Sequence, residues 1–318
     1  GYAGLVKENG LEPLPLDSEA VDHIEDLGGT ILGTSRGPQD TGRMVDYLEE
    51  LGINLLFVIG GDGTLRGGRD LAAEIRRRSR AIAVVGVPKT IDNDIEFIEM
   101  SFGFRTAVAE AGTAVAAAHV EAKSARYGVG LVKLMGRHSG FIAAHATLAG
   151  SLVNFCLVPE SPFTLEAFLP ALERRLRERG HAVVVVAEGA GQDLIGADLG
   201  VDASGNRRLA DIGVFLRDRI RAYMAERNLP VSLKYIDPSY MIRGIPANAF
   251  DSAFCLLLGH NAVHAAMSGR TNMVVGYWHG EFTHVPIPMA VSRRKQIDLD
   301  SRLWSSVLAA TGQPRDMR

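Results

Sequence analysis

The feature that most constrains the fold is a regular alternation of short apolar, β-rich runs with longer stretches of helical periodicity. This pattern is typical of parallel sheets that are covered by helices on both faces. The predicted strands are residues 55–59, 82–87, 129–134, 153–158, 182–187, 233–236 and 273–277. The predicted helices are residues 68–78, 103–123, 140–149, 164–179, 209–227, 248–268 and 300–311. The sequence therefore predicts an α/β protein.

The composition narrows the class of protein. The chain has 318 residues, 47% apolar and 22% charged, which is enough for two domains with real cores. A net charge of −3 gives no general attraction to nucleic acid or to a membrane surface, and we expect neither as a partner. There is no apolar run of transmembrane length and no signal peptide. A glycine- and aspartate-rich loop at residues 190–208 is expected to be mobile.

Two pairs of residues that could bind metal or form a disulfide lie in apolar surroundings. Cys156 and Cys255 are predicted to be buried thiols, which indicates a reducing, cytoplasmic compartment. His260 and His264 have the i, i+4 spacing of metal ligands, but we interpret their apolar helix as part of the core.

A glycine-rich segment with one carboxylate, "GGDGT" at residues 60–64, follows the first predicted strand. Glycines let the backbone approach a ligand closely, and a helix beginning near Gly67 would point N–H groups at an anion. Asp62 could hold Mg²⁺ against phosphate oxygens, or it could only cap a turn. Because NAD kinases and lipid kinases share this segment, it indicates a phosphate donor without naming the acceptor.

Two carboxylates, Asp92 and Asp94, follow the second predicted strand in "PKTIDND". Ligands of open parallel sheets bind at the carboxyl ends of strands, so these residues are expected beside the glycine-rich segment. A carboxylate that takes the proton of a sugar hydroxyl accelerates transfer by about 10²–10⁴-fold. Asp92 is the predicted base, and Asp94 and Thr90 would orient it or a metal ion. The alternative is an ordinary Asx-rich turn.

Two later segments carry cations that suit phosphate. In "MGRHSG", Arg137 opens a helix and is placed to bind a phosphoryl oxygen, whereas His138 is expected to be structural. In "KYIDPSYMIR", Lys234, Tyr240 and Arg243 set two cations and a hydroxyl around one turn, which suits a phosphomonoester.

Together, GGDGT, PKTIDND, MGRHSG and YIDPSYMIR resemble the phosphofructokinase family, and the similarity covers almost the whole chain. The resemblance implies two Rossmann-like three-layer α/β/α domains with mostly parallel sheets. Residues 1–103 plus 243–290 would bind nucleotide and magnesium, and residues 104–242 plus 291–318 would bind the sugar phosphate. The implied reaction is Mg²⁺-dependent transfer from ATP to the 1-hydroxyl of fructose 6-phosphate, a glycolytic step, in a cytoplasmic homodimer or homotetramer.

The resemblance also assigns roles residue by residue. Asp62 would bind the Mg²⁺ of the donor, Tyr2 would lie near the adenine, and Arg36 would contact the nucleotide phosphates. The expected catalytic residues are Asp92, Arg137, Thr90 and Asp94. The expected sugar-phosphate contacts are Met135, Gly136, Glu188, Lys234, Tyr240 and Arg243. The expected donor contacts are Tyr2, Arg36, Gly61, Asp62, Gly63 and Thr64.

Two positions bear on which donor is used. Pyrophosphate-using members of the family place an aspartate where Gly63 stands, and that carboxylate would repel the α-phosphate of ATP. A lysine at the position of Lys89 is common among the pyrophosphate enzymes, but one subgroup of ATP users also has it, together with the "YIDPSY" segment. This chain looks most like that subgroup, so ATP is the expected donor and pyrophosphate the alternative.

The sequence also departs from the family pattern. The first strand and glycine-rich phosphate loop of the family precede "GYAGL" and are absent here, so we expect poor catalysis from the chain as given. The effector site of the bacterial allosteric members is not recognisable, and we expect no such regulation. A non-catalytic sugar-phosphate-binding relative is a distant alternative, although every recognisable catalytic position is intact.

Overall fold

The computed structural model describes residues 1–318 except 197–198, 203–204 and 206. The prediction of a mobile loop at residues 190–208 therefore falls partly outside the described residues; within the loop the structure has a short helix, α6 (Gln192–Ile195). The chain forms two compact units. Unit 1 comprises Gly1–Phe104, Gly200–Arg207 and Gly244–Lys295, and unit 2 comprises Arg105–Leu199, Arg208–Arg243 and Gln296–Arg318.

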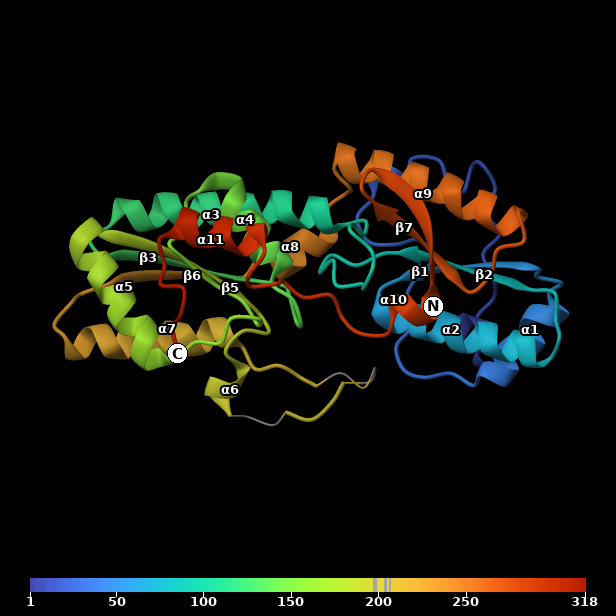
Figure 1. The fold of residues 1–318 in the computed structure, drawn as a ribbon, viewed down its shortest axis with the longest axis horizontal. Helices are drawn as coiled ribbons and strands as arrows, with labels where there is room; N and C mark the ends of the chain where they lie inside the picture. Colours follow the sequence, from blue (N-terminus) through green and yellow to red (C-terminus); the bar gives the residue numbers. More distant parts are fainter. Residues whose placement is uncertain (197–198, 203–204, 206) are drawn as a thin grey trace. The chain divides into compact units, whose positions relative to one another are not determined.

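Unit 1 is built on a four-stranded mixed sheet (Figure 1). Its strands are β1 (Leu55–Gly60), β2 (Ala83–Pro88), β7 (Met273–Trp278) and β8 (Glu281–Pro286), in the order β1-β2-β7-β8. Its helices are α1 (Thr41–Glu50), α2 (Asp62–Arg77), α9 (Ala249–Met267) and α10 (Ile287–Ala290), preceded by the 3-10 turns η1 (Tyr2–Leu5), η2 (Lys7–Asn9) and η3 (Ile24–Asp26). β1, β2 and β7 are parallel, and β8 returns antiparallel to β7.

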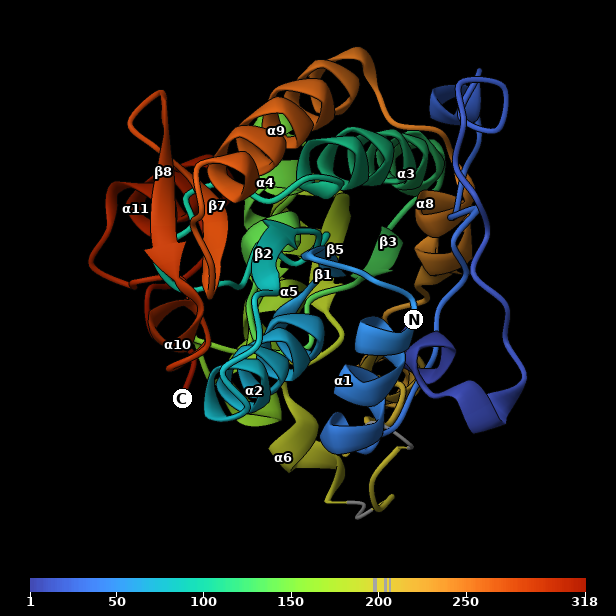
Figure 2. The same cartoon turned by 90° about the vertical axis from the view of Figure 1, so that its right-hand side faces the viewer.

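The sheet of unit 1 buries both of its faces. Leu48, Leu65 and Leu71 of α1 and α2 are fully buried on one face, whereas Phe254 and Leu258 of α9 pack on the other. Figure 2 shows α9 on one side of β2 and β7, and α1 and α2 on the opposite side. Two apolar layers explain why the strands read as continuous hydrophobic runs instead of alternating ones.

Unit 2 contains a four-stranded sheet in which every pairing is parallel. Its strands are β3 (Gly128–Leu134), β4 (Phe155–Leu157), β5 (His181–Ala187) and β6 (Ser232–Ile236), in the order β4-β5-β3-β6. Its helices are α3 (Phe104–Ser124), α4 (Phe141–Gly150), α5 (Leu165–Arg179), α6, α7 (Ile212–Glu226), α8 (Ser239–Gly244) and α11 (Arg302–Thr311). Figure 1 shows α3, α4 and α11 on one face of this sheet and α5 and α7 on the other.

The ends of the helices in unit 2 follow from local chemistry. Thr164 caps α5, because its hydroxyl accepts a hydrogen bond from the Ala167 amide at 3.3 Å. Pro170 lies inside α5 and the helix runs on through it to Arg179. Gly180 ends α5 in the left-handed conformation that favours glycine.

The two sheets, with their flanking helices, confirm the predicted α/β architecture with mostly parallel sheets.

Several expectations about single elements were wrong. α2 begins at Asp62 and not near Gly67, and β8 was not predicted. Cys156 is buried as expected, but Cys255 is only half-buried. His260 and His264 lie on the exposed face of α9, so that helix is a surface element and not a core one. Within the described residues, no helix is both long enough and apolar enough to span a membrane.

Candidate active site

The loops that follow β1 and β2 lie against each other in unit 1. The two strands are parallel neighbours in register, with Gly60 opposite Pro88, and the Lys89 amide donates to the Gly60 carbonyl at 3.0 Å. A Cβ atom on Gly61 would lie 3.5 Å from the carbonyl oxygen of Lys89 and from the Cβ of Thr90. The glycine-rich segment and the TIDND segment therefore meet at the carboxyl ends of the two strands.

The glycine-rich segment forms the first turn of α2. Gly61 is the N-cap and Asp62 the first helical residue, so the first N–H bonded within the helix is that of Leu65, to the Gly61 carbonyl at 3.0 Å. The amides of the first turn consequently point out of the helix end, where an anion is favoured. Gly63 is exposed, and a Cβ atom there would meet no atom within 4 Å. The space next to Gly63 is therefore open.

Asp62 and Asp94 share one cation. One nitrogen of the Arg294 guanidinium lies 3.2 Å from Asp62 Oδ2, and the other lies 2.9 Å from Asp94 Oδ2. Arg66, one turn along α2, also contacts Asp62 Oδ2 at 3.0 Å. The two carboxylates are almost buried, with side chains 10% and 5% exposed, and Arg294 is 31% exposed. The structure thus brings together two acids from different loops within reach of a single positive charge.

Arg294 was missed by the sequence analysis. It belongs to the run Arg293-Arg294-Lys295, which follows α10 and has no acidic residue next to it in the sequence. A run of cations usually indicates a solvated surface, and Arg293, whose side chain is 76% exposed, fits that expectation. Only the fold brings Arg294 to carboxylates some two hundred positions earlier in the chain.

The TIDND turn is held by its own side chains. Asn93 adopts a left-handed backbone (φ 52°), and its amide side chain bonds the Ser101 amide and the Glu99 carbonyl. Thr90 Oγ1 accepts from the Asp92 amide at 3.2 Å and lies 3.3 Å from Asp94 Oδ1. The half-buried Asp92 therefore sits on a braced loop beside the Asp62–Asp94 pair, and Thr90 and Asp94 contact each other.

The chemistry of these side chains fits a magnesium ion. Mg²⁺ prefers oxygen ligands and is commonly held by one or two carboxylates together with phosphate oxygens and water. Asp62 and Asp94 supply such oxygens, and the Arg294 contact shows that one cation can reach both. Across the described part of the chain, no group of three or more His, Cys, Asp or Glu residues could hold a metal ion.

The two N-terminal residues expected to contact the phosphate donor, Tyr2 and Arg36, lie in different surroundings. The ring of Tyr2 packs on α2, where a Cβ atom on Gly67 would lie 2.5 Å from it, and its hydroxyl donates to the Thr64 carbonyl. Burial, reinforced by the nearby Asp70, raises the pKa of this hydroxyl above its usual value. Tyr2 therefore supports the back of the first turn of α2, while Arg36 is exposed on an irregular segment.

In unit 2, the loops after β3 and β5 interlock. Gly136 has φ 123°, and a Cβ atom there would lie 2.4 Å from the Ser139 carbonyl oxygen. A Cβ on Gly189 would lie 2.0 Å from the Arg137 carbonyl oxygen, so both positions require glycine. The Glu188 amide donates to the Leu134 carbonyl at 2.9 Å, which brings Glu188 next to the MGR loop. Arg137 and Glu188 are both half-buried, whereas Met135 is buried.

A further acid, Glu160, organises this region and was not singled out from the sequence. Its carboxylate accepts from the Gly140 amide at 3.0 Å, at the start of α4, and from the Ile297 amide at 2.9 Å. Burial raises the pKa of Glu160, although these backbone hydrogen bonds oppose the rise. Glu160 therefore fixes the helix that follows the MGR loop.

The three expected phosphate-binding residues of "KYIDPSYMIR" do not all lie on the same element. Tyr240 and Arg243 stand on α8, beyond the carboxyl end of β6, and both are exposed. Lys234 lies inside β6, and its ammonium group pairs with Glu121 of α3 at 3.4 Å. The structure therefore gives Lys234 a partner on a different element from the one that carries Tyr240 and Arg243.

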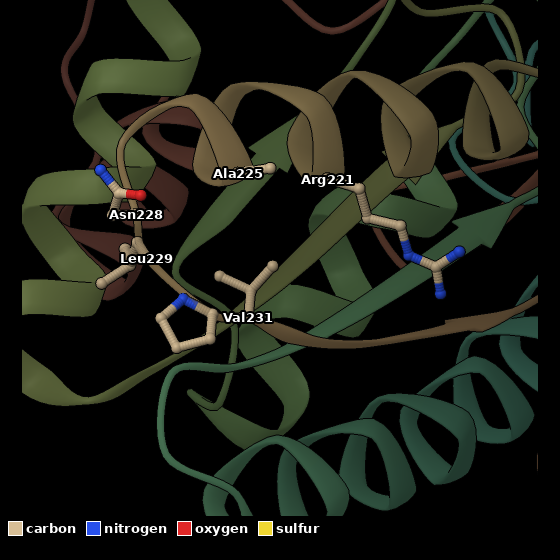
Figure 3. A pocket seen from close by; sticks show the side chains of 6 residues that line it. Arg221, Ala225, Asn228, Leu229 and Val231 are labelled. Carbon is tan, nitrogen blue, oxygen red and sulfur yellow. The ribbon is translucent and has the colours of Figure 1, made fainter.

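Figure 3 shows a pocket at the opposite end of β6, where the chain leaves α7 and enters the strand. Its lining residues are Arg221, Ala225, Asn228, Leu229, Pro230 and Val231. Because it lies at the amino end of the strand and is lined mostly by apolar groups, it is not part of the candidate site.

Known proteins resemble this chain in both sequence and fold. The phosphofructokinase family model matches residues 1–266. The chain is 50% identical to the ATP-dependent 6-phosphofructokinase of Borreliella burgdorferi, over 100% of this chain and 73% of that protein. It is 50% identical to the enzyme of that name from Amycolatopsis methanolica (98% and 70% covered) and 49% identical to that of Trypanosoma cruzi (100% and 66% covered). This chain thus spans roughly two thirds of the length of these relatives.

Solved structures share the fold at lower identity. The pyrophosphate-dependent phosphofructokinase from Marinobacter aquaeolei superposes with a TM-score of 0.77 at 21% identity, covering 98% of this chain and 80% of that one. Pichia pastoris phosphofructokinase in the T-state gives 0.72 at 23% identity, covering 98% and 33%. The chain therefore belongs to the phosphofructokinase family.

Proposed function

We propose that this chain catalyses ATP-dependent phosphorylation of fructose 6-phosphate at its 1-hydroxyl, giving fructose 1,6-bisphosphate and ADP. The observation that carries the proposal is the convergence of Asp62 and Asp94 on one cation, beside Asp92, in a chain about 50% identical to ATP-dependent 6-phosphofructokinases. Two acidic loops that meet at the carboxyl ends of neighbouring strands suit a phosphoryl donor and its metal.

Unit 1 is proposed to hold the donor. Asp62 and Asp94 would ligate Mg²⁺, which neutralises charge on the donor phosphates when it is bound. The amides of the first turn of α2 would bind phosphate oxygens, since they point out of the helix end at Gly63 and Thr64. Arg294 holds the two carboxylates together in the absence of metal, and it must release at least one of them when the metal binds.

Asp92 is proposed to be the base. Its carboxylate would take the proton of the 1-hydroxyl, and the freed oxygen would attack the γ-phosphorus of ATP. The bond from that phosphorus to the bridging oxygen then breaks, and its electron pair leaves with ADP. Arg137 would offset the negative charge of the transferring group, because guanidinium groups bind phosphoryl oxygens in a bidentate manner.

Unit 2 is proposed to bind the sugar phosphate. Met135, Gly136 and Glu188 come from the loops after β3 and β5, which are packed closely on each other and would together position a sugar ring. Tyr240 and Arg243 of α8 would bind the 6-phosphate. Lys234 is the weakest of the candidates, because its ammonium group pairs with Glu121.

The choice of ATP over pyrophosphate is proposed to depend on Gly63. The open space over this residue leaves room for the α-phosphate and the nucleoside, whereas an aspartate would place a negative charge there. Gly63→Asp is expected to lower kcat/KM for ATP at least about tenfold, which corresponds to roughly 1.4 kcal/mol of lost transition-state stabilisation. Gly259→Asp is a matched control, since Gly259 is also an exposed helical glycine with open space around it.

The direct experiment is a steady-state assay of the full-length product of the gene that encodes this chain. Formation of fructose 1,6-bisphosphate is measured with Mg²⁺ and either ATP or pyrophosphate as donor. The proposal expects turnover with ATP and little with pyrophosphate. Turnover with pyrophosphate alone would overturn the donor assignment, and no turnover with either donor would overturn the proposed reaction. Light scattering of the same sample tests the homodimer or homotetramer that we propose.

A further inference from the structure

A half-buried lysine, Lys133, lies near the end of β3, two residues before the MGR motif. Its ammonium group contacts Asp211 Oδ2 at 2.9 Å and Asp237 Oδ2 at 2.8 Å, and its side chain is only 13% exposed. Asp211 caps α7, and Asp237 follows β6. One lysine therefore ties the ends of two strands to the start of a helix.

Tyr235 of β6 completes this cluster. Its hydroxyl donates to Asp211 Oδ1 at 3.0 Å, and its ring covers the first turn of α7, where a Cβ atom on Gly213 would lie 2.3 Å from it. Burial, opposed by Lys133, raises the pKa of Tyr235 to about 12. Burial lowers the pKa of Lys133, but its two carboxylate partners outweigh that effect and raise the pKa above its usual value. The cluster is therefore a paired, charged network.

The network reaches the expected substrate-binding helix through Asp237. While one oxygen of Asp237 accepts from Lys133, the other accepts from the Ser239 amide at 3.1 Å and from the Ser239 hydroxyl. Ser239 is the first residue of α8, the short helix that carries Tyr240 and Arg243. Fixing Asp237 therefore fixes the direction in which α8 leaves the sheet.

We propose that Lys133 is a positioning residue for the sugar phosphate: through Asp237 it holds α8, with Tyr240 and Arg243, in register with the MGR loop. This inference rests on the proposed function. Lys133 is not proposed to contact the substrate itself, because its ammonium group is engaged with Asp211 and Asp237. A helix of six residues with one buried side chain, Ile242, has little packing of its own, so we expect the ionic anchor at its start to contribute to its position.

The alternative is that Lys133 only stabilises unit 2. A purely structural residue would lower the melting temperature and the fraction of active enzyme without changing the KM of the remaining enzyme. A positioning residue would raise the KM for fructose 6-phosphate and leave the KM for ATP unchanged, because ATP is assigned to unit 1. The two roles therefore predict different kinetic results.

The test measures KM for each substrate, kcat and melting temperature in full-length Lys133→Met, Lys133→Arg and Asp237→Asn. Lys133→Met is expected to raise the KM for fructose 6-phosphate about tenfold or more, as the loss of one charge-assisted hydrogen bond would. Asp237→Asn should act in the same direction, the double variant should be little worse than Lys133→Met, and Lys133→Arg should recover part of the loss. Arg177→Met, which breaks an exposed ion pair with Glu173 on α5, is the matched control and should change neither KM.

The outcomes separate the two proposals. If the wild type is active and Lys133→Met has the same KM for fructose 6-phosphate as the wild type, the inference is overturned and the proposed function stands. Equal increases in KM for both substrates also overturn it. A wild type with no activity overturns the proposed function and the inference with it. If Lys133→Met does not fold, Lys133→Arg and Asp237→Asn decide the question.

Discussion

Replacing Arg294 with methionine tests whether this residue neutralises the two acids of the proposed donor site. Its guanidinium lies 3.2 Å from Asp62 and 2.9 Å from Asp94, whose side chains are almost buried. Methionine keeps much of the length of the side chain and removes the charge. In the metal-free protein the variant leaves two neighbouring carboxylates with less positive charge between them, so it should be less stable.

The magnitude follows from these contacts. Removing one partner of a buried ion pair costs about 3–5 kcal/mol, because the other charge is left without compensation. Arg294 is 31% exposed and Asp62 keeps Arg66, so water and a second cation reduce the penalty. A loss of about 2 kcal/mol remains, which lowers the melting temperature by about 4–8 °C for a domain of this size.

Thermal unfolding in metal-free buffer, and then with excess Mg²⁺, measures both parts of the prediction. Mg²⁺ should raise the melting temperature of Arg294→Met more than that of the wild type, since the ion then replaces the lost charge. Arg43→Met is the matched control: Arg43 pairs with Glu8 in the same unit, and their side chains are 60% and 61% exposed, so its loss should cost less than about 1 kcal/mol. If the two variants unfold alike, and respond alike to Mg²⁺, the reasoning is refuted.

Three further predictions address other parts of the molecule. Asp92→Asn should lower kcat about 10²–10⁴-fold in steady-state assays, with thermal unfolding unchanged; retention of wild-type kcat would exclude Asp92 as the base. Gly67→Ala should lower the free energy of unfolding in urea by about 1–3 kcal/mol, because its Cβ would lie 2.5 Å from the Tyr2 ring; an unchanged midpoint would count against that packing. Burial raises the pKa of Asp237, but its hydrogen bonds, above all the one from Lys133, lower the pKa overall to below the ordinary value of 3.8. The Lys133–Asp237 pair therefore stabilises the protein at pH values above 3.8. This stabilisation is lost as the pH falls through the lowered pKa of Asp237. The melting temperatures of wild type and Lys133→Met should therefore differ most near neutral pH and converge in acid, and a gap that persists in acid would contradict the pairing.

The fold could be predicted from the sequence where burial alone decides the pattern. Strands buried on both faces are continuous apolar runs, so β1, β2, β3, β5, β6 and β7 were found with nearly correct bounds. β8 was missed because it lies at the edge of its sheet, and its residues Glu281 and His284 interrupt the apolar pattern. The start of α2 was misplaced because Gly63 and Gly67 indicate a turn, although the structure uses them inside the helix.

The candidate site could be predicted only where the residues are close in the sequence. Asp92, Asp94 and Thr90 form one turn, and parallel-strand topology places that turn beside Asp62. Arg294 and Lys133 lie far from their carboxylate partners along the chain, and neither a cation within a basic run nor one inside an apolar strand gives a signal of its partner. Lys234 is a different case: adjacency to "YIDPSY" suggested a phosphate contact, which stays a prediction, whereas its position on β6 brings its ammonium group to Glu121 of α3.

The most direct test of the central claim is a crystal structure of the full-length protein with Mg²⁺ and a non-hydrolysable ATP analogue. The account predicts the ion within about 2.1 Å of a carboxylate oxygen of Asp62 or Asp94, with Arg294 moved away from that oxygen and phosphate oxygens at the first turn of α2. An ion bound by neither acid, with Arg294 still bridging both, would contradict it.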